Sequence, residues 1–255
     1  GITHVIRGDE HVPNTARQLA IIDLMGWPRP VFAHIPMVLS MDRRKLGKRT
    51  GSTPIREYRE RGFLPEALDA YLATLSWTPS AGVDPFDLTS LAASFSLNNI
   101  AQSSPVHDEE HLLHWQKEAM KGRGGESLVK ELVASEPRFA PFEDRLAPLA
   151  ADVLEEAPFL HDLNEILSFL WTQQNPEYRE PWMQSLGIEL KGLIPWTPET
   201  VEGLLRSFMK ERGLKGRDFF HPLRRLLTGR DSGAPLPLVI FTLGREECVL
   251  RLGLL

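Results

Sequence analysis

Strand-like runs are confined to the first 40 of the 255 residues, and the later patterned segments are helical. The runs THVIRG (3–8) and PVFAHIPMVLS (30–40) are apolar and β-branched, and segment 14–27 between them has helical spacing. Strand, helix and strand in this order predict a parallel α/β unit, in which Asn14 or Thr15 caps the helix. The turn at 8–15 and the loop at 41–51 are then expected at one edge of the sheet.

The remaining chain predicts a mainly α fold. From residue 53 onward, amphipathic segments are separated by proline and glycine, and GRGG (122–125) is the best candidate for a linker. Two strands alone cannot complete a sheet, so residues 1–40 are expected either to lean on other polypeptide or to expose apolar surface. The expected helices cover 53–62, 64–77, 87–95, 108–122, 126–136, 148–160, 163–171, 197–214, 216–229 and 236–252.

Composition is that of an ordinary globular protein. Hydrophobic residues make up 42% and charged residues 25% of the chain, and no apolar run approaches the 18 residues of a membrane span. The single cysteine, Cys248, excludes an internal disulfide and fits a reducing compartment. We therefore expect no membrane association and a cytoplasmic location.

Positive charge is concentrated in two islands of a chain whose net charge is −5. Residues 1–62 contain 11 Lys/Arg and 6 Asp/Glu, and residues 204–230 contain 8 and 2. This pattern would suit contact with a long polyanion at two places. A chance distribution of solvated charges explains it equally well. Within the first island, MDRRKLGKRTG (41–51) forms a glycine-interrupted cationic loop that suits a polyphosphate or serves as a solvated turn.

Four pieces in this order resemble one family. They are THVIRGDEHVPNTARQ, GWPRPVFAHIPMVLSMDRRKLGKRTG, EYRERGFLPEALDAYLATLSW, and the pair FFHPLRRLLTG and LGREECVLRL. Together they look like the second half of a bacterial-type glutamyl-tRNA synthetase, a class I enzyme that activates glutamate with ATP and transfers it to tRNA. The resemblance covers essentially the whole chain. It implies a partial Rossmann-type unit, helical stem-contact and helical anticodon-binding domains, and an upstream first half with the family's His-rich ATP motif.

The resemblance also implies roles for residues near the basic loop. KLGKR (45–49) stands where the family has its second signature, so Lys45 and Lys48 are expected to stabilise charge on the ATP phosphates. Gly47 departs from the family's usual serine, and GDEH (8–11) departs from its usual Gly-Glu-Asp-His. Arg7 matches the arginine that binds the carboxylate of the amino acid. The other expected ATP contacts are Val38, Leu46, Glu10 and His11.

The implied domains are a Rossmann remnant (1–40), the signature loop with the stem-contact domain (41–123), and two anticodon-binding units (124–185 and 186–255). Arg217, Arg224 and Arg225 are expected to contact tRNA(Glu), with one of the adjacent pair facing RNA. Phe208 and one of Phe219 and Phe220 are expected in the core. The expected substrates are glutamate, tRNA(Glu) and ATP with Mg²⁺, without a bound metal or organic cofactor, and the full-length enzyme is expected to be a monomer.

Several alternatives accompany these roles. Without the resemblance, Arg7 would be interpreted as a residue of a surface ion pair. Asp9 and Glu10 could cap the following helix instead of contacting a ligand. His107, His111 and His114 have helical spacing, but without a cysteine or fourth ligand nearby we predict no zinc site. The chain alone is expected to be inactive, and a non-catalytic tRNA-binding fragment or degenerate paralogue is the alternative function. The glutaminyl branch is disfavoured because this tail reads as helical.

Overall fold

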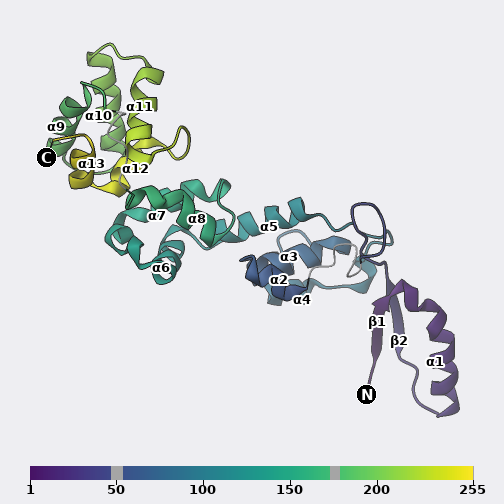
Figure 1. The fold of residues 1–255 in the computed structure, drawn as a ribbon. Helices are drawn as coiled ribbons and strands as arrows, with labels where there is room; N and C mark the ends of the chain where they lie inside the picture. Colours follow the sequence, from purple (N-terminus) through teal and green to yellow (C-terminus); the bar gives the residue numbers. More distant parts are fainter. Residues whose placement is uncertain (47–53, 173–178, 255) are drawn as a thin grey trace. The chain divides into compact units, whose positions relative to one another are not determined.

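A computed structural model describes residues 1–46, 54–172 and 179–254 of the chain. The chain divides into two compact units, Gly1–Ala119 and Met120–Leu255. The predicted residues Gly47, Lys48 and Arg49 lie outside the described residues. Figure 1 labels the helices and strands of both units.

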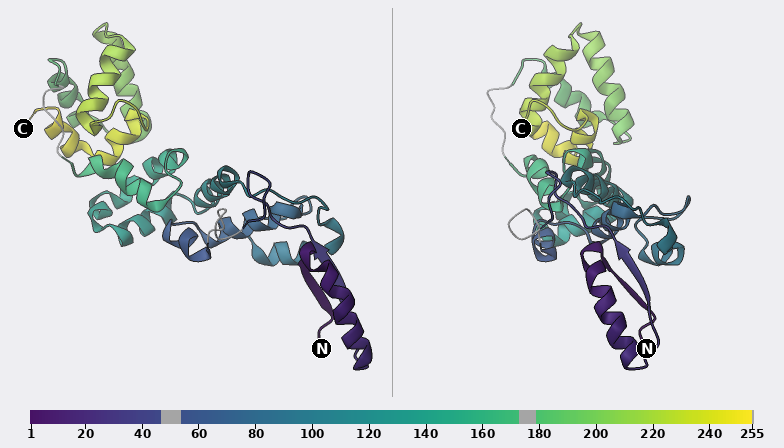
Figure 2. Two further views of the ribbon diagram at one scale, coloured as in Figure 1. Left: turned by 45° about the vertical axis from the view of Figure 1, so that its right-hand side comes forward. Right: turned by 90° about the vertical axis from the view of Figure 1, so that its right-hand side faces the viewer.

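The first unit opens with a small parallel sheet. Strands β1 (His4–Gly8) and β2 (Val31–Ile35) pair in parallel, with Val5 opposite Phe32 and Arg7 opposite His34. A 3₁₀ turn at Asp9–His11 leads into α1 (Val12–Leu24), which runs beside the two strands (Figures 1 and 2). The predicted strand–helix–strand unit is therefore present. After Ile35, the described residues contain isolated β-bridges but no further strand.

Two local predictions in this unit were wrong. The first helix begins at Val12, with His11 as its N-cap, rather than at Asn14 or Thr15. Pro13 lies in the first turn, where a missing amide costs nothing and a fixed φ suits the helix. The second strand ends at Ile35 rather than at residue 40, because Pro36 has no amide for a ladder hydrogen bond. The earlier helix start moves Thr15 from the cap into the helix.

Residues 1–46 contain no buried side chain. Large apolar side chains there are strongly exposed, including Ile2 at 74%, Leu24 at 87% and Trp27 at 56%. A two-stranded sheet with one helix has too little surface to enclose a core, so its apolar residues remain in contact with solvent. In this chain by itself the segment is exposed, and whether other polypeptide covers it stays a prediction.

A helical core fills the remainder of the first unit. It is built on Tyr58, Phe63, Tyr71 and Leu112, which are at most 8% exposed. Gln116 is fully buried within it and accepts a 2.9 Å hydrogen bond from the Leu64 amide. The helices are α2 (Ile55–Glu60), α3 (Pro65–Ser76), α4 (Leu88–Ser94) and α5 (Glu109–Gly122), with a 3₁₀ turn at Leu97–Asn99.

The second unit is helical throughout its described residues. Helix α6 packs on α7, α12 packs on α7 and α10, and α13 packs on α9. Phe208 and Phe219 are fully buried and Phe220 is half-buried, as predicted. The helices are α6 (Gly125–Ser135), α7 (Glu143–Asp152), α8 (Leu160–Ile166), α9 (Met183–Gly192), α10 (Pro198–Glu211), α11 (Gly216–Thr228), α12 (Leu236–Leu243) and α13 (Arg245–Arg251), with 3₁₀ turns at Pro137–Phe142, Val153–Glu155 and Leu167–Leu170.

The structure refines several helix boundaries. The segment predicted at 236–252 is two helices, because Gly244 has φ +83° and turns the chain between α12 and α13. Helix α7 starts at Glu143 and contains Pro148, so the prediction of a helix at 148–160 began too late. The predicted domain boundary at 185/186 falls inside α9, and the finer division into four domains stays a prediction. The predicted fold class, mainly α with a partial Rossmann-type unit, is confirmed.

Candidate functional site

Arg7 lies near the end of β1 and is held by three neutral side chains. Its Nη1 donates to Gln18 Oε1 at 2.7 Å, its Nη2 to Thr15 Oγ1 at 2.8 Å, and its Nε to His34 Nε2 at 3.3 Å. The guanidinium also lies 5.2 Å from the centroid of the Phe32 ring. Because His34 accepts at Nε2, the neutral ring carries its proton on Nδ1. No carboxylate of the described residues forms an ion pair with Arg7, which leaves its charge available to an anion.

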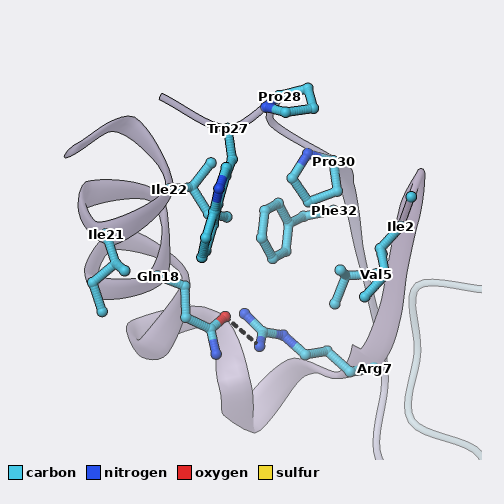
Figure 3. Close-up of a pocket in the computed structure, with 11 residues that line it drawn as sticks. Ile2, Val5, Arg7, Gln18, Ile21, Ile22, Trp27, Pro28, Pro30 and Phe32 are labelled. Carbon is cyan, nitrogen blue, oxygen red and sulfur yellow. Dashed lines mark hydrogen bonds between the residues drawn. The ribbon is translucent and has the colours of Figure 1, made fainter. Parts of the chain in front are cut away.

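A cavity of about 590 Å³ lies between α1 and the sheet. Figure 3 shows Ile22, Trp27 and Phe32 pointing into it, and Arg7 reaching toward Gln18 at one end. The lining is otherwise apolar, so the guanidinium meets a surface that screens its charge poorly.

A second, more polar cavity of about 450 Å³ lies where the two strands end. Its lining includes Asp9, His34, Pro36, Asn98 and Gln102. In open sheets with parallel strands, ligands bind outside the carboxyl ends of the strands. His34 borders this cavity, and its Nε2 contacts Arg7 of the first cavity at 3.3 Å, so one hydrogen bond links the linings of the two cavities.

The beginning of the basic loop is a closed turn. The Ser40 amide donates to the Arg44 carbonyl at 2.9 Å, and the Arg43 amide donates to the Ser40 carbonyl at 2.8 Å. Arg43 has φ +59°, a left-handed conformation that is costly for a residue with a side chain. Strain of this kind persists where surrounding contacts fix the backbone, as the two hydrogen bonds do here.

Lys45 and Glu10 bring the loop and the turn after β1 together. Lys45 Nζ lies 3.5 Å from Glu10 Oε1, across 35 residues of sequence. The pKa of Glu10 is lowered, chiefly by a hydrogen bond from its own amide and further by the positive charge of Lys45. The expected proximity of the turn and the loop is therefore present in the structure. The pair is exposed, so it is readily exchanged for contacts with a charged ligand.

The other expected ATP contacts are less organised. Val38 and Leu46 flank the turn at Ser40–Arg44 and are half-buried. His11 is exposed, and its Nδ1 lies 3.3 Å from the side-chain nitrogen Nδ2 of Asn14. Sequence reasoning missed Thr15, Gln18 and His34 as partners of Arg7. The helical spacing of Thr15 and Gln18 was a visible signal, because residues three apart share a helix face.

The three arginines predicted to contact RNA have different surroundings. Arg217 is exposed, and its side chain has no hydrogen bond or ion pair with other described residues. Arg224 is half-buried and donates to the Ala234 carbonyl at 2.6 Å, and burial lowers the pKa of its guanidinium. Arg225 donates to Asp231 Oδ2 at 2.9 Å, and this contact lowers the pKa of Asp231. Arg217 is therefore the best placed of the three to contact a phosphate.

The histidines considered as metal ligands are otherwise engaged. His107 contacts two tyrosines, and His111 and His114 stack at 6.3 Å between ring centroids. His107 precedes α5, so the three histidines do not share one helix. In the described ranges, no group of three or more histidine, cysteine or carboxylate side chains is arranged to hold a metal ion.

Within residues 1–46, 54–172 and 179–254, no helix is both long enough and apolar enough to cross a bilayer.

Two family models match consecutive parts of the chain. Residues 1–114 match the catalytic domain of class I tRNA synthetases (E and Q), and residues 131–254 match an anticodon binding domain. The candidate site described above lies within the first match, and the three arginines lie within the second.

Individual proteins give the same result. The chain is 33% identical over 262 residues to glutamate–tRNA ligase 1 of Fervidobacterium nodosum, covering 99% of this chain and 55% of that protein. It is 37% identical over 265 residues to glutamate–tRNA ligase 1 of Rubrobacter xylanophilus, covering 98% and 61%. A crystal structure of a glutamate tRNA ligase from Elizabethkingia meningosepticum has the same fold, with a TM-score of 0.79 at 23% identity, and covers 98% of this chain and 56% of that one.

The chain thus spans about half the length of the curated relatives that it matches. With a catalytic-domain match followed by an anticodon-domain match, the chain belongs to the class I tRNA synthetases of the glutamate and glutamine group, of which it corresponds to a C-terminal portion.

Proposed function

We propose that the chain is the C-terminal portion of a glutamate–tRNA ligase. This enzyme would activate glutamate with ATP, in the presence of Mg²⁺, and transfer it to tRNA(Glu). The observation that carries the proposal is the meeting of Glu10 and Lys45 at the carboxyl edge of the sheet, beside an arginine without a carboxylate partner in the described residues. Similarity to glutamate–tRNA ligases over nearly the whole chain supports it.

The proposed roles follow from the charge and position of each side chain. Arg7 binds a carboxylate of glutamate, and Lys45 and Lys48 stabilise the ATP phosphates during attack on the α-phosphate. Val38 and Leu46 contact the adenine end, with Glu10 and His11 beside the nucleotide. Arg217, Arg224 and Arg225 contact tRNA. The cytoplasmic location, the monomeric state and the absence of a resident cofactor stay predictions.

Pyrophosphate exchange tests the proposal directly. The parent protein is defined here as the polypeptide that contains these 255 residues with the upstream catalytic segment of the relatives. We expect it to catalyse glutamate-dependent ATP–pyrophosphate exchange, measured with and without tRNA, and we expect the 255-residue chain alone to be inactive. A parent that binds tRNA without exchange in either condition would support the alternative, a non-catalytic tRNA-binding protein.

Replacing Arg7 with alanine in the parent is expected to raise the KM for glutamate about 10- to 150-fold. The reason is the loss of charge-assisted hydrogen bonds worth about 1.5–3 kcal/mol. Arg17→Ala removes the same charge from an exposed position on α1 and is the matched control. Steady-state kinetics with varied glutamate would show the difference, and normal glutamate saturation in the Arg7 variant would remove Arg7 from the site.

Replacing Arg217 with alanine is expected to weaken tRNA binding and to reduce the slope of log affinity against log salt by about 1. One fewer phosphate contact releases one fewer counterion. Lys130→Ala, at an exposed position of α6, removes the same charge elsewhere in the second unit and should leave the slope unchanged. Affinities at three or more salt concentrations test this. Equal slopes for the Arg217 variant and the wild type would identify Arg217 as a solvated residue.

A further inference from the structure

The backbone just before the basic loop is attached to a distant segment. The Leu39 amide donates to the Pro105 carbonyl at 2.8 Å, and the His107 amide donates to the Leu39 carbonyl at 2.7 Å. Leu39 also forms an antiparallel bridge with Lys45. The turn from Ser40 to Arg44 is therefore closed at its base by Leu39 and fixed through Leu39 to residues 105–107.

The side chain of His107 is held by two buried tyrosines. Its Nδ1 lies 2.6 Å from the Tyr71 hydroxyl, and its Nε2 lies 3.4 Å from the Tyr58 hydroxyl. The Tyr71 hydroxyl accepts the Asp108 amide at 3.0 Å, which leaves its own proton to donate to Nδ1. Tyr71 is 2% exposed, and burial raises the pKa of its hydroxyl, so that the donating proton is retained.

Asp108 connects this network to a helix. Its Oδ1 accepts the Glu110 amide at 2.9 Å at the start of α5. A continuous set of short contacts thus runs from α3, through Tyr71 and His107, to Leu39 and the turn that ends at Lys45. These hydrogen bonds are partly buried, and together they favour one arrangement of the backbone, because each lost bond would leave a partly buried group unpaired.

We propose that His107 is a positioning residue which, with Tyr71, fixes the backbone at Leu39 and thereby holds Lys45 beside the strand ends. This inference rests on the proposed function, because a fixed backbone at Leu39 matters only if Lys45 binds a phosphate. A base that drifts by an ångström would misplace Lys45 relative to the strand ends. The network provides a rigid anchor at Leu39 from which the loop extends.

Hydrogen exchange in the 255-residue chain tests the anchor without any activity. Tyr71→Phe, which removes one oxygen, and His107→Leu are expected to speed exchange of the Leu39 and His107 amides about tenfold, the effect of losing one typical hydrogen bond. His107→Asn should restore slow exchange, because its side-chain carbonyl replaces the acceptor at the position of Nδ1. His114→Asn on α5 is the control and should change little. Tyr58→Phe, whose contact with His107 is longer than that of Tyr71, should speed exchange less than Tyr71→Phe does.

Slow exchange at Leu39 in both Tyr71→Phe and His107→Leu would overturn the inference. The inference would also be overturned if Tyr71→Phe increased the rate of amide exchange equally in peptides of α3 and α4. That pattern would report a general loosening of the unit. Tyr71→Phe remains informative if His107→Leu fails to fold.

The kinetics of ATP–pyrophosphate exchange in the parent protein separate this inference from the proposed function. With Tyr71→Phe we expect kcat for ATP–pyrophosphate exchange to fall about tenfold while the KM for glutamate stays within twofold. An inactive wild-type parent would contradict the proposed function and leave the amide-exchange result to decide whether the anchor exists. An active wild type with an unaffected Tyr71→Phe variant would contradict the positioning role alone.

Discussion

Replacing Arg251 with methionine is expected to lower the free energy of unfolding of the second unit by about 3–5 kcal/mol, the usual cost of breaking a buried charged network. Arg251 is 8% exposed and connects three segments that are distant in sequence. Its Nη1 donates to the carbonyls of Phe169 at 2.9 Å and Leu227 at 2.7 Å, and its Nη2 donates to that of Leu170 at 3.2 Å. Methionine fills much of the volume but removes all three hydrogen bonds to these carbonyls.

The chain contains a matched control for this change. Arg251 pairs with Glu247 one helical turn earlier, and Arg206 pairs in the same way with Glu202, but the Arg206 side chain is 73% exposed. Arg206→Met should therefore cost at most about 0.5 kcal/mol. Because the chain has two units, amide exchange of peptides from α11 and α13 is a better measure than a single melting curve. Similar losses for both variants would show that the ion pair, rather than the carbonyl contacts, carries the effect.

The sequence predicted the elements of the fold better than their contacts. Runs of apolar and β-branched residues marked β1 and β2, and helical spacing marked most helices of the second unit. Helix α9 was missed although Met183, Leu186 and Leu190 have helical spacing and are fully buried. That signal was present in the sequence.

The contacts around Arg7 depended on facts that a one-dimensional pattern does not contain. His34 reaches Arg7 because β1 and β2 pair in one particular register, and Thr15 reaches it because α1 begins at Val12. The link between Leu39 and His107 joins segments 68 residues apart through backbone groups, which every residue possesses. The types of the predicted site residues were visible from the sequence, whereas the partners that orient Arg7 required the fold.

The exposed sheet has a consequence for any experiment on this chain alone. Since residues 1–46 bury no side chain, Arg7 and Lys45 are held by local contacts without a surrounding core. Surface hydrogen bonds and ion pairs of this kind are individually weak. Kinetic tests of these residues therefore belong in the parent protein, whereas the amide-exchange tests of the link between Leu39 and His107 and of helices α11 and α13 need no activity and suit the chain itself.

Replacing Lys48 with alanine in the parent is expected to slow formation of glutamyl-adenylate about 30- to 900-fold, a loss of about 2–4 kcal/mol of transition-state stabilisation. Lys48 lies outside the described residues, so its role is proposed from the KLGKR sequence. Attack of the glutamate carboxylate increases negative charge on the phosphates, and a cation that meets this charge mainly in the transition state raises kcat rather than lowering KM. The KM for ATP should therefore change much less than kcat.

Lys45 and Arg44 provide graded controls for this prediction. Lys45 is already paired with Glu10 at 3.5 Å, and exchanging this partner for a phosphate offsets part of the gain. Lys45→Ala should therefore slow the reaction less than Lys48→Ala does. Arg44 is exposed and lies 3.3 Å from Asp42, so Arg44→Ala should have little effect. Single-turnover measurement of adenylate formation would rank the three variants. Equal losses for Lys48→Ala and Arg44→Ala would mean that the loop acts through its total charge rather than through one placed lysine.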